Sequence, residues 1–289
     1  MRQFCLFIGA LGYALAAQSP VIHSLDASIA SVNAMTQDSA GNLYLTGATT
    51  SLQFPVTPGT YQTHYHDEGL CDYVGDVVVP CSEAFVMKLD ATGKVLWATL
   101  LGGSGWDGIG AIAVDSTGNV ILTGETSPVS VGGQANDFPV TADALFPNPT
   151  AQNSHAISVP VDSFLSILSP DGKKLIYSTY LPGLQGLSLA LGPEDGIYLS
   201  GSVERGKSSI RPTPGSFQTA FRATATTVLV MKLKARGTAL AYATYLGGSH
   251  WEESGAIAVD SSGSVYVTGV TDSADFPVTA GSFRTARTV

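Results

Sequence analysis

Charged residues are scarce in this sequence, and basic residues are the scarcer kind. They make up 13% of the 289 positions, with 23 acidic against 14 basic residues and a formal net charge of −9. Such a surface repels the phosphate groups of nucleic acids and of anionic membranes, so we expect neither as a partner. Neutral polysaccharides and other proteins fit better, and we expect a polysaccharide or a cell-surface protein as the partner.

The sequence also lacks the motifs that mark common catalytic sites. It contains no G-x-S-x-G nucleophile elbow, no His-Glu-x-x-His zinc motif and no glycine-rich phosphate loop. No long amphipathic helical pattern occurs either, which favours an all-β chain. We therefore expect a non-catalytic protein without a cofactor, although the absence of motifs does not decide the question of enzymatic activity.

The first 17 residues are typical of a secretory signal peptide. Met1–Ala17 combines a basic start, an apolar stretch and an A-x-A cleavage site. The apolar stretch is shorter than the roughly 18 residues that a membrane helix needs, and no later segment is suited to span a bilayer. We therefore expect export, to the periplasm or the cell exterior.

Cysteine is rare, with three copies, of which the first lies in the predicted signal peptide. Cys71 and Cys81 remain, and in an oxidising compartment two cysteines so close in sequence predict a local disulfide. His64 and His66 precede them in the same insertion, together with acidic residues. A metal site needs a defined ligand set, so we favour a polar loop here and leave metal binding by the two histidines open.

One short motif occurs four times. GNLYLTG, GNVILTG, DGIYLSG and GSVYVTG begin at residues 41, 118, 195 and 263. In the last copy, Ala256–Asp260 and Ser264–Thr268 read as two strands joined by a small-residue turn with glycine, which predicts a hairpin. Asp38, Asp115 and Asp260 open three of these turns. We interpret them as bonding to backbone amides, because the sequence has no D-x-[DN]-x-[DN]-G calcium loop.

Two further blocks recur in the same order. A second hairpin is predicted from Phe85, Phe164 and Val228, and its second strand reads L-x-Y-x-T-Y-L-G-G-S in the clearest copy. A Phe-Pro-Val-Thr signature at Phe54, Phe138 and Phe276 follows the first hairpin, and we expect its ring to pack under the connection. Each full unit thus supplies four short strands, which we name a to d in chain order. Tandem four-stranded units predict a β-propeller.

These motifs, above all the run D-S-x-G-N-x-Y-x-T-G, resemble the SBBP beta-propeller repeats of secreted bacterial proteins. The resemblance extends over nearly all of residues 18–289 and implies an extracellular bacterial repeat protein, with no catalytic residues to carry over. The third unit departs most, because it lacks the D-F-P signature. The units are expected at roughly 27–104, 105–183, 184–249 and 250–289.

Candidate site residues follow from strand direction. In an antiparallel a-b-c-d sheet, the d–a and b–c connections emerge on one face, which carries Trp106-Asp107 and Trp251-Glu252. A flat aromatic ring beside an acceptor suits a sugar- or peptide-binding surface, although we favour tryptophans that cap the junctions between units. The rival is a carbohydrate-active hydrolase or lyase that uses Asp107 and Glu252, whose carboxyl groups would then lie roughly 5–10 Å apart.

The sequence therefore predicts a secreted, non-catalytic propeller acting as an extracellular binding or scaffold module, with no ligand identified. Strands a and b of the fourth unit end at Thr268, and the sequence stops soon after the last D-F-P-V-T signature. We expect about three and a half blades in an open or truncated array. The exposed ends of such an array are available for self-association.

Overall fold

The computed structural model describes residues 30–65, 70–74, 77–127, 136–149, 161–234 and 236–284, with the backbone alone for those between 70 and 80. The described chain consists of β-strands, turns and one short 3-10 turn, η1 (Pro193–Asp195). Within these ranges, no helix has the length and apolar character needed to cross a bilayer. The predicted signal peptide, Met1–Ala17, lies outside the described residues.

Three antiparallel sheets have four strands each. The first sheet contains β1 (Ser31–Gln37), β2 (Leu43–Thr49), β5 (Glu83–Leu89) and β6 (Val95–Leu101). The second contains β7 (Trp106–Val114), β8 (Val120–Ser127), β9 (Asp162–Leu168) and β10 (Leu175–Leu181). The third contains β11 (Leu184–Leu191), β12 (Ile197–Glu204), β13 (Thr226–Leu233) and β14 (Leu240–Leu246). Strands a to d thus lie in chain order across every complete sheet.

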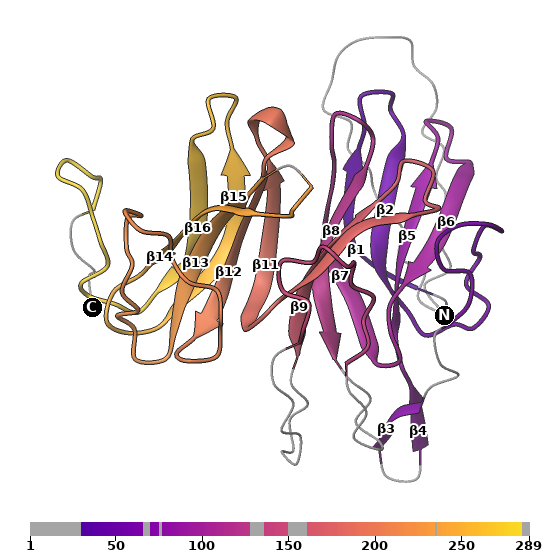
Figure 1. Ribbon diagram of the computed structural model, residues 1–289, viewed down its shortest axis with the longest axis horizontal. Coiled ribbons are helices and arrows are strands. Elements are labelled where there is room, and N and C mark those ends of the chain that lie inside the picture. Colours follow the sequence, from indigo (N-terminus) through magenta and orange to yellow (C-terminus); the bar gives the residue numbers. More distant parts are fainter. Residues whose placement is uncertain are drawn as a thin grey trace.

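A fourth sheet has only two strands, β15 (Glu252–Val259) and β16 (Val265–Thr271). We call it the half-blade. The sheets follow one another across the molecule, with β1 to β10 on the right of Figure 1 and β11 to β16 on the left. A separate small hairpin, β3 (Leu70–Val74) with β4 (Val77–Pro80), projects below the first sheet (Figure 1). The predicted all-β, propeller-type fold with an open array of units is confirmed.

Strand a bends at the same place in every unit. Its register with strand b shifts opposite the glycine that ends the repeated motif, as between Ile109 and Ala111 beside Gly124. A β-carbon on Gly124 would lie 2.0 Å from the carbonyl oxygen of Gly108, and one on Gly47 would lie 1.8 Å from that of Ser31. The motif therefore ends in glycine because strand a approaches too closely for any side chain.

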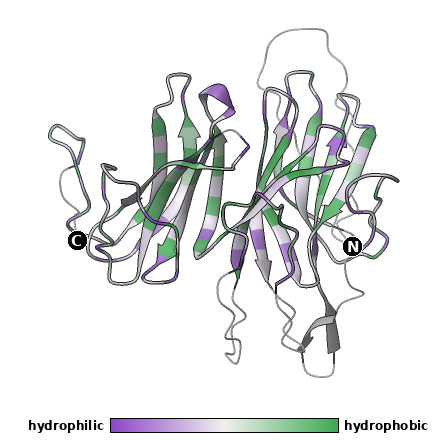
Figure 2. Cartoon of the chain, viewed as in Figure 1, coloured by the Kyte–Doolittle hydropathy of each residue, from purple (hydrophilic) through white to green (hydrophobic). Residues whose placement is uncertain are grey.

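The core lies between neighbouring sheets as well as under each connection. Apolar residues, green in Figure 2, line the strands, and one buried cluster joins the second sheet to the third. As expected, Phe54 and Phe138 are buried, with their rings 4.7 Å from Phe85 and 4.1 Å from Phe164 between centroids. Phe276, which has no such partner strand among the described residues, is only half-buried.

The connection between strands b and c covers the outer edge of strand d. In the first sheet the amide of Thr57 donates to the carbonyl oxygen of Ala98 at 2.8 Å. Thr141 makes the same contact with Ser178, at 3.0 Å, in the second sheet. We call residues 57–62, 141–146 and 213–218 the capping segments. They occupy the hydrogen-bonding groups that an outer strand would otherwise expose to aggregation.

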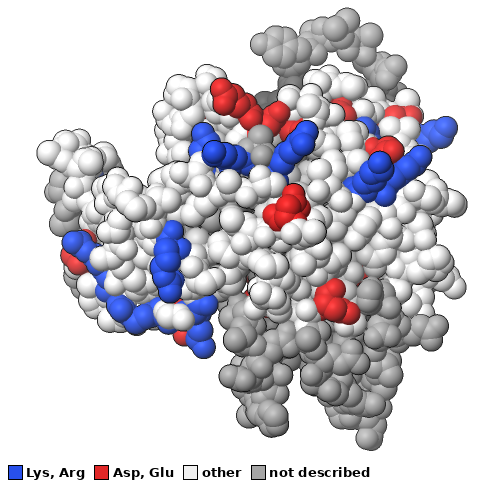
Figure 3. All heavy atoms as spheres, viewed as in Figure 1, with Lys and Arg blue, Asp and Glu red and all other residues white. Residues whose placement is uncertain are grey.

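Charged side chains cover a small part of the surface seen in Figure 3, which is mostly uncharged. The b–c connection of the third sheet departs from the acidic character of the chain, because residues 205–225 contain four basic residues and no acidic one. The negative net charge is therefore unevenly distributed along the chain. A largely uncharged surface suits neutral ligands better than polyanions.

Candidate ligand-binding site

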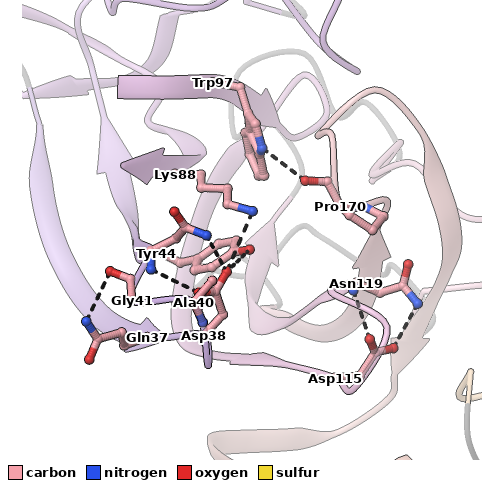
Figure 4. Close-up of polar contacts among 11 residues, drawn as sticks. Gln37, Asp38, Ala40, Gly41, Tyr44, Lys88, Trp97, Asp115, Asn119 and Pro170 are labelled. Carbon is pink, nitrogen blue, oxygen red and sulfur yellow. Dashed lines mark hydrogen bonds and ion pairs between the residues drawn. The ribbon is translucent and has the colours of Figure 1, made fainter. Parts of the chain in front are cut away.

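The aspartates of the a–b turns hold the turns closed. Asp38 Oδ1 accepts hydrogen bonds from the amides of Ala40 and Asn42, at 3.0 and 2.9 Å (Figure 4). Its Oδ2 accepts from the Tyr44 hydroxyl at 3.1 Å and lies 3.7 Å from Lys88 Nζ. Burial acts to raise the pKa of Asp38, but the hydrogen bonds from Asn42 and Tyr44 and the charge of Lys88 outweigh it and lower the pKa. The interpretation of these aspartates as turn residues is confirmed.

The same arrangement recurs at Asp115 and Asp260, each of which accepts two backbone amide bonds through Oδ1. The third unit differs because its turn contains η1 and no aspartate at this position. Its Asp195 instead accepts a 3.0 Å bond from the amide of Ser116 in the second sheet. These carboxylates are therefore committed to structural contacts.

The carboxylates predicted for ligand binding are buried at the d–a corners. Asp107 and Glu252 are both 0% exposed, and both lie within strands, because β7 and β15 extend further towards the N-terminus than the sequence pattern indicates. The amide of Gly103 donates to Asp107 Oδ2 at 2.9 Å, and that of Gly248 donates to Glu252 Oε1 at 3.1 Å. Each carboxyl group thus fastens the glycine pair that precedes it, and neither is accessible as an acceptor for a ligand.

Burial also changes the acidity of Asp107. Desolvation raises its pKa to about 7, hydrogen bonds from Thr126 and from the amide of Gly103 oppose the rise, and the nearby charge of Asp137 adds to it. A shifted carboxyl group is often a sign of catalysis, but structural groups are shifted as well. A glycosidase acid must contact the glycosidic oxygen of its substrate. The side chain of Asp107 is fully buried, so a substrate does not reach it.

The two candidate tryptophans are exposed, but the carboxylates that follow them in sequence, Asp107 and Glu252, are buried and out of reach of a ligand. Trp106 opens β7 and is 42% exposed, while Trp251 immediately precedes β15 and is 37% exposed. They hold equivalent places before Asp107 and Glu252. The expected surface of paired tryptophan and carboxylate is therefore not formed at either corner, although the aromatic half of it is present at both.

Trp106 lies on the wall of a groove of about 270 Å³. Strands of three units line this groove, because β7 contacts both β1 and β11. Ala48 and Leu187 contribute apolar surface, and Asn33 and Glu125 contribute polar atoms. The groove therefore offers an aromatic plate with acceptor and amide groups nearby, which is the usual composition of a small-molecule site.

Asn33 and Glu125 were not among the residues predicted from the sequence. The side-chain Nδ2 of Asn33 donates to the carbonyl oxygen of Ile109 at 3.1 Å and so joins the first sheet to the second. Glu125 follows the motif glycine, where the other three units have Ala48, Ser202 and Val270. The sequence signal that could have identified Glu125 is that it is the one acidic residue among four equivalent positions, of which the other three are uncharged.

The remaining sequence predictions lie partly outside the described residues. His64 is exposed, and its Nδ1 lies 3.0 Å from Thr63 Oγ1, but His66 is not described. Among the described side chains, no three His, Cys, Asp or Glu residues form a group suited to a metal ion. Cys81 is buried and belongs to a disulfide, while the side chain of Cys71 is not described, so their pairing stays a prediction.

Repeated four-stranded antiparallel sheets, each joined to the next through a d–a corner, define a repeat protein of the β-propeller type. A comparison with protein families agrees with this class. Residues 241–277, which run from β14 through the half-blade to its D-F-P signature, match the family model of the SBBP beta-propeller repeat. The chain therefore contains an SBBP-type beta-propeller repeat at these residues. No curated protein matches the sequence.

Proposed function

We propose that this chain is a secreted, non-catalytic propeller that binds a neutral saccharide in the Trp106 groove and acts as an extracellular binding or scaffold module. Secretion is supported by the signal-peptide pattern of Met1–Ala17. Binding is supported above all by Trp106, whose large ring is 42% exposed on the groove wall. A ring exposed to this extent offers a flat apolar face on which a ligand can stack.

The lining of the groove indicates the chemistry of the ligand. Among the described residues, the lining combines apolar surface with one carboxylate, Glu125, and one carboxamide, Asn33, and includes no basic side chain. A neutral sugar has apolar faces for the ring of Trp106 and hydroxyl groups that donate to carboxylate oxygens. The volume of about 270 Å³ lies near the lower end of small-molecule sites, which suits one sugar ring of a longer chain.

Titration with neutral oligosaccharides of glucan, xylan and chitin type, followed by isothermal titration calorimetry, tests the proposal. We expect one of them to bind and Trp106→Ala to weaken that binding at least about tenfold, because the aromatic plate is lost. Trp251→Ala is the matched control, since Trp251 has similar exposure at the equivalent corner but does not line the groove. Its binding is expected to stay within about twofold of the parent protein.

Two results contradict the proposal. Equal binding by the parent and Trp106→Ala would exclude the groove as the site, and the absence of any binding would exclude the saccharide class. The same mixtures, assayed for shorter products, examine the rival enzyme. Hydrolysis that Glu252→Gln abolishes, with the circular dichroism spectrum unchanged, would show a carbohydrate-active enzyme.

A further inference from the structure

The groove contains a carboxylate without a counter-charge. Glu125 lines the groove, and within the described part of the chain its side chain forms no hydrogen bond and no ion pair. The described lining has no basic side chain that could compensate its charge. The negative charge of Glu125 is therefore available to a ligand, and it attracts a positively charged group.

Trp106 and Glu125 lie on one face of the second sheet. Gly108 of β7 stands directly opposite Glu125 of β8, and Trp106 lies two residues before Gly108 in the same strand. Side chains two residues apart on a strand share a face, so Trp106 and Glu125 are diagonal neighbours. The indole ring bends back over Gly108, where a β-carbon would lie 3.7 Å from its Cη2 atom. The ring and the carboxylate therefore lie side by side along the groove.

The half-blade lacks this pair, although it has an equivalent tryptophan. Glu253 stands where the second unit has Gly108, and it pairs with Val270, which stands where the second unit has Glu125. Trp251 is therefore followed by a side chain in place of the open glycine, and it has an apolar diagonal neighbour in place of the acid. The pairing of ring and carboxylate is a feature of the second unit and not of the repeat.

The lining is also rich in hydrogen-bond acceptors. Thr123 lies two residues before Glu125 on β8, and its buried hydroxyl group has no partner among the described residues. The equivalent Thr46 donates to the carbonyl oxygen of Phe85 at 2.6 Å. The carboxamide nitrogen of Asn33 is already used in its bond to Ile109. An ammonium group, which has donors only, matches this lining better than a hydroxyl group does.

We propose that the groove also binds a sugar that carries a protonated amine, and binds it more tightly than the matching neutral sugar. The ammonium group would lie beside the carboxylate of Glu125, in a charge-assisted hydrogen bond, and close to the ring of Trp106, which attracts cations. This inference rests on the proposed function, because it takes the groove to be a saccharide site.

Three oligosaccharides with the same β-1,4 linkage and length test the proposal. They carry a hydroxyl, an acetamide or an ammonium group at carbon 2 of each ring and are otherwise alike. Calorimetric titration of the whole protein in low salt at about pH 6 keeps free amines protonated. We expect the ammonium form to bind at least about tenfold more tightly than either neutral form.

Two matched variants locate the attraction. Glu125→Gln keeps the shape of the side chain and removes its charge, so the advantage of the ammonium form is expected to fall to within about twofold. Glu253→Gln removes the same charge from an exposed position outside the described groove lining, and it is expected to leave the advantage unchanged.

The outcomes separate this inference from the proposed function. Binding of a neutral form that Trp106→Ala weakens, without tighter binding of the ammonium form, overturns the inference and leaves the proposed function standing. An advantage that both glutamine variants reduce equally also overturns it, because the net charge of the chain is then the cause. Tight binding of the ammonium form alone, lost in Glu125→Gln, supports the inference and contradicts the neutral ligand. The absence of any binding overturns both.

Discussion

The first hairpin of the chain, β1–β2, and the last, β15–β16, carry the same motif in different surroundings. The turns are alike in detail, because Tyr44 bonds to Asp38 and Tyr266 bonds to Asp260, both at 3.1 Å. Their burial differs, since the first tyrosine is covered by its own sheet and the second is exposed. The hairpin therefore forms with local hydrogen bonds alone, whereas the burial of its side chains in a core depends on strands c and d.

The largest expected effect tests that difference directly. Tyr44→Ala removes a fully buried ring that packs against Trp97, and we expect the free energy of unfolding to fall by about 4 kcal/mol. Tyr266→Ala removes an exposed ring and is expected to cost less than about 1 kcal/mol. Urea unfolding followed by circular dichroism measures both.

Tyr44→Phe separates the ring from its hydroxyl group. It keeps the packing and loses the bond to Asp38, so we expect a loss of about 1 kcal/mol. Equal effects of the two alanine substitutions would show that the half-blade is as well buried in solution as the first sheet. That result would remove the distinction between complete and incomplete units.

The second prediction concerns the motif glycines. Gly124→Ala places a methyl group 2.0 Å from the carbonyl oxygen of Gly108 in a complete sheet, and a loss of about 3 kcal/mol is expected. Gly269→Ala places one 2.3 Å from that of Glu253, but the half-blade can open alone. We therefore expect faster hydrogen exchange in β15 and β16 with little change in the unfolding midpoint. A large midpoint shift for Gly269→Ala would mean that the half-blade unfolds together with the rest.

The third prediction uses two carboxyl groups with opposite shifts. The pKa of Asp107 is raised to about 7, so the native state holds this proton where the unfolded chain has lost it. Its contribution to stability is present at low pH and falls between about pH 4 and 7, by up to about 1.4 kcal/mol per pH unit. The pKa of Asp260 is lowered to about 2 by bonds from Ser262 and Ser264. Its contribution is present above about pH 4 and is lost as the pH falls towards 2.

Urea unfolding at a series of pH values tests both signs. Asp107→Asn is expected to flatten the profile between pH 4 and 7, and Asp260→Asn to flatten it below pH 4. The Asp260 effect is expected to be the smaller one, because its carboxyl group is exposed to solvent. A profile that Asp107→Asn leaves unchanged would show that this carboxyl group is ionised in the native state throughout.

Much of the fold was predictable because each hairpin of the repeat is specified by residues that are close together in the sequence. Turn aspartates and positive-φ glycines such as Gly41, Gly118 and Gly263 fix the hairpins with neighbours in sequence. Recurrence then groups the hairpins into sheets. The start of strand a was not predictable in the same way, because Trp106 and Asp107 continue it past a bulge that depends on the approach of β8. Periodicity is lost at a bulge.

Of the residues that line the candidate site, only the aromatic one, Trp106, was predictable from the sequence. Trp106 stands out by residue type, but the burial of Asp107 follows from the packing of the d–a corner around Gly102 and Gly103. Glu125 reaches the groove because β8 lies beside β7, a fact of sheet pairing. A sequence pattern specifies which side chains are available, while their access to a ligand is decided by contacts between distant segments.

The capping segments have a consequence for how such arrays can change in length. Each complete sheet is edged by a segment from its own b–c connection, as Thr57 covers β6 and Thr141 covers β10. A tandem duplication or deletion of one whole unit therefore includes the capping segment of that unit and leaves no unpaired strand d edge. The permissible cuts lie at the d–a corners, two of which are formed by a Gly-Gly pair and a buried acid, Asp107 or Glu252, while the corner between the second and third sheets has Pro182 and Gly183 instead. The number of blades can thus change by whole repeats without requiring a new segment to cover the edge of strand d.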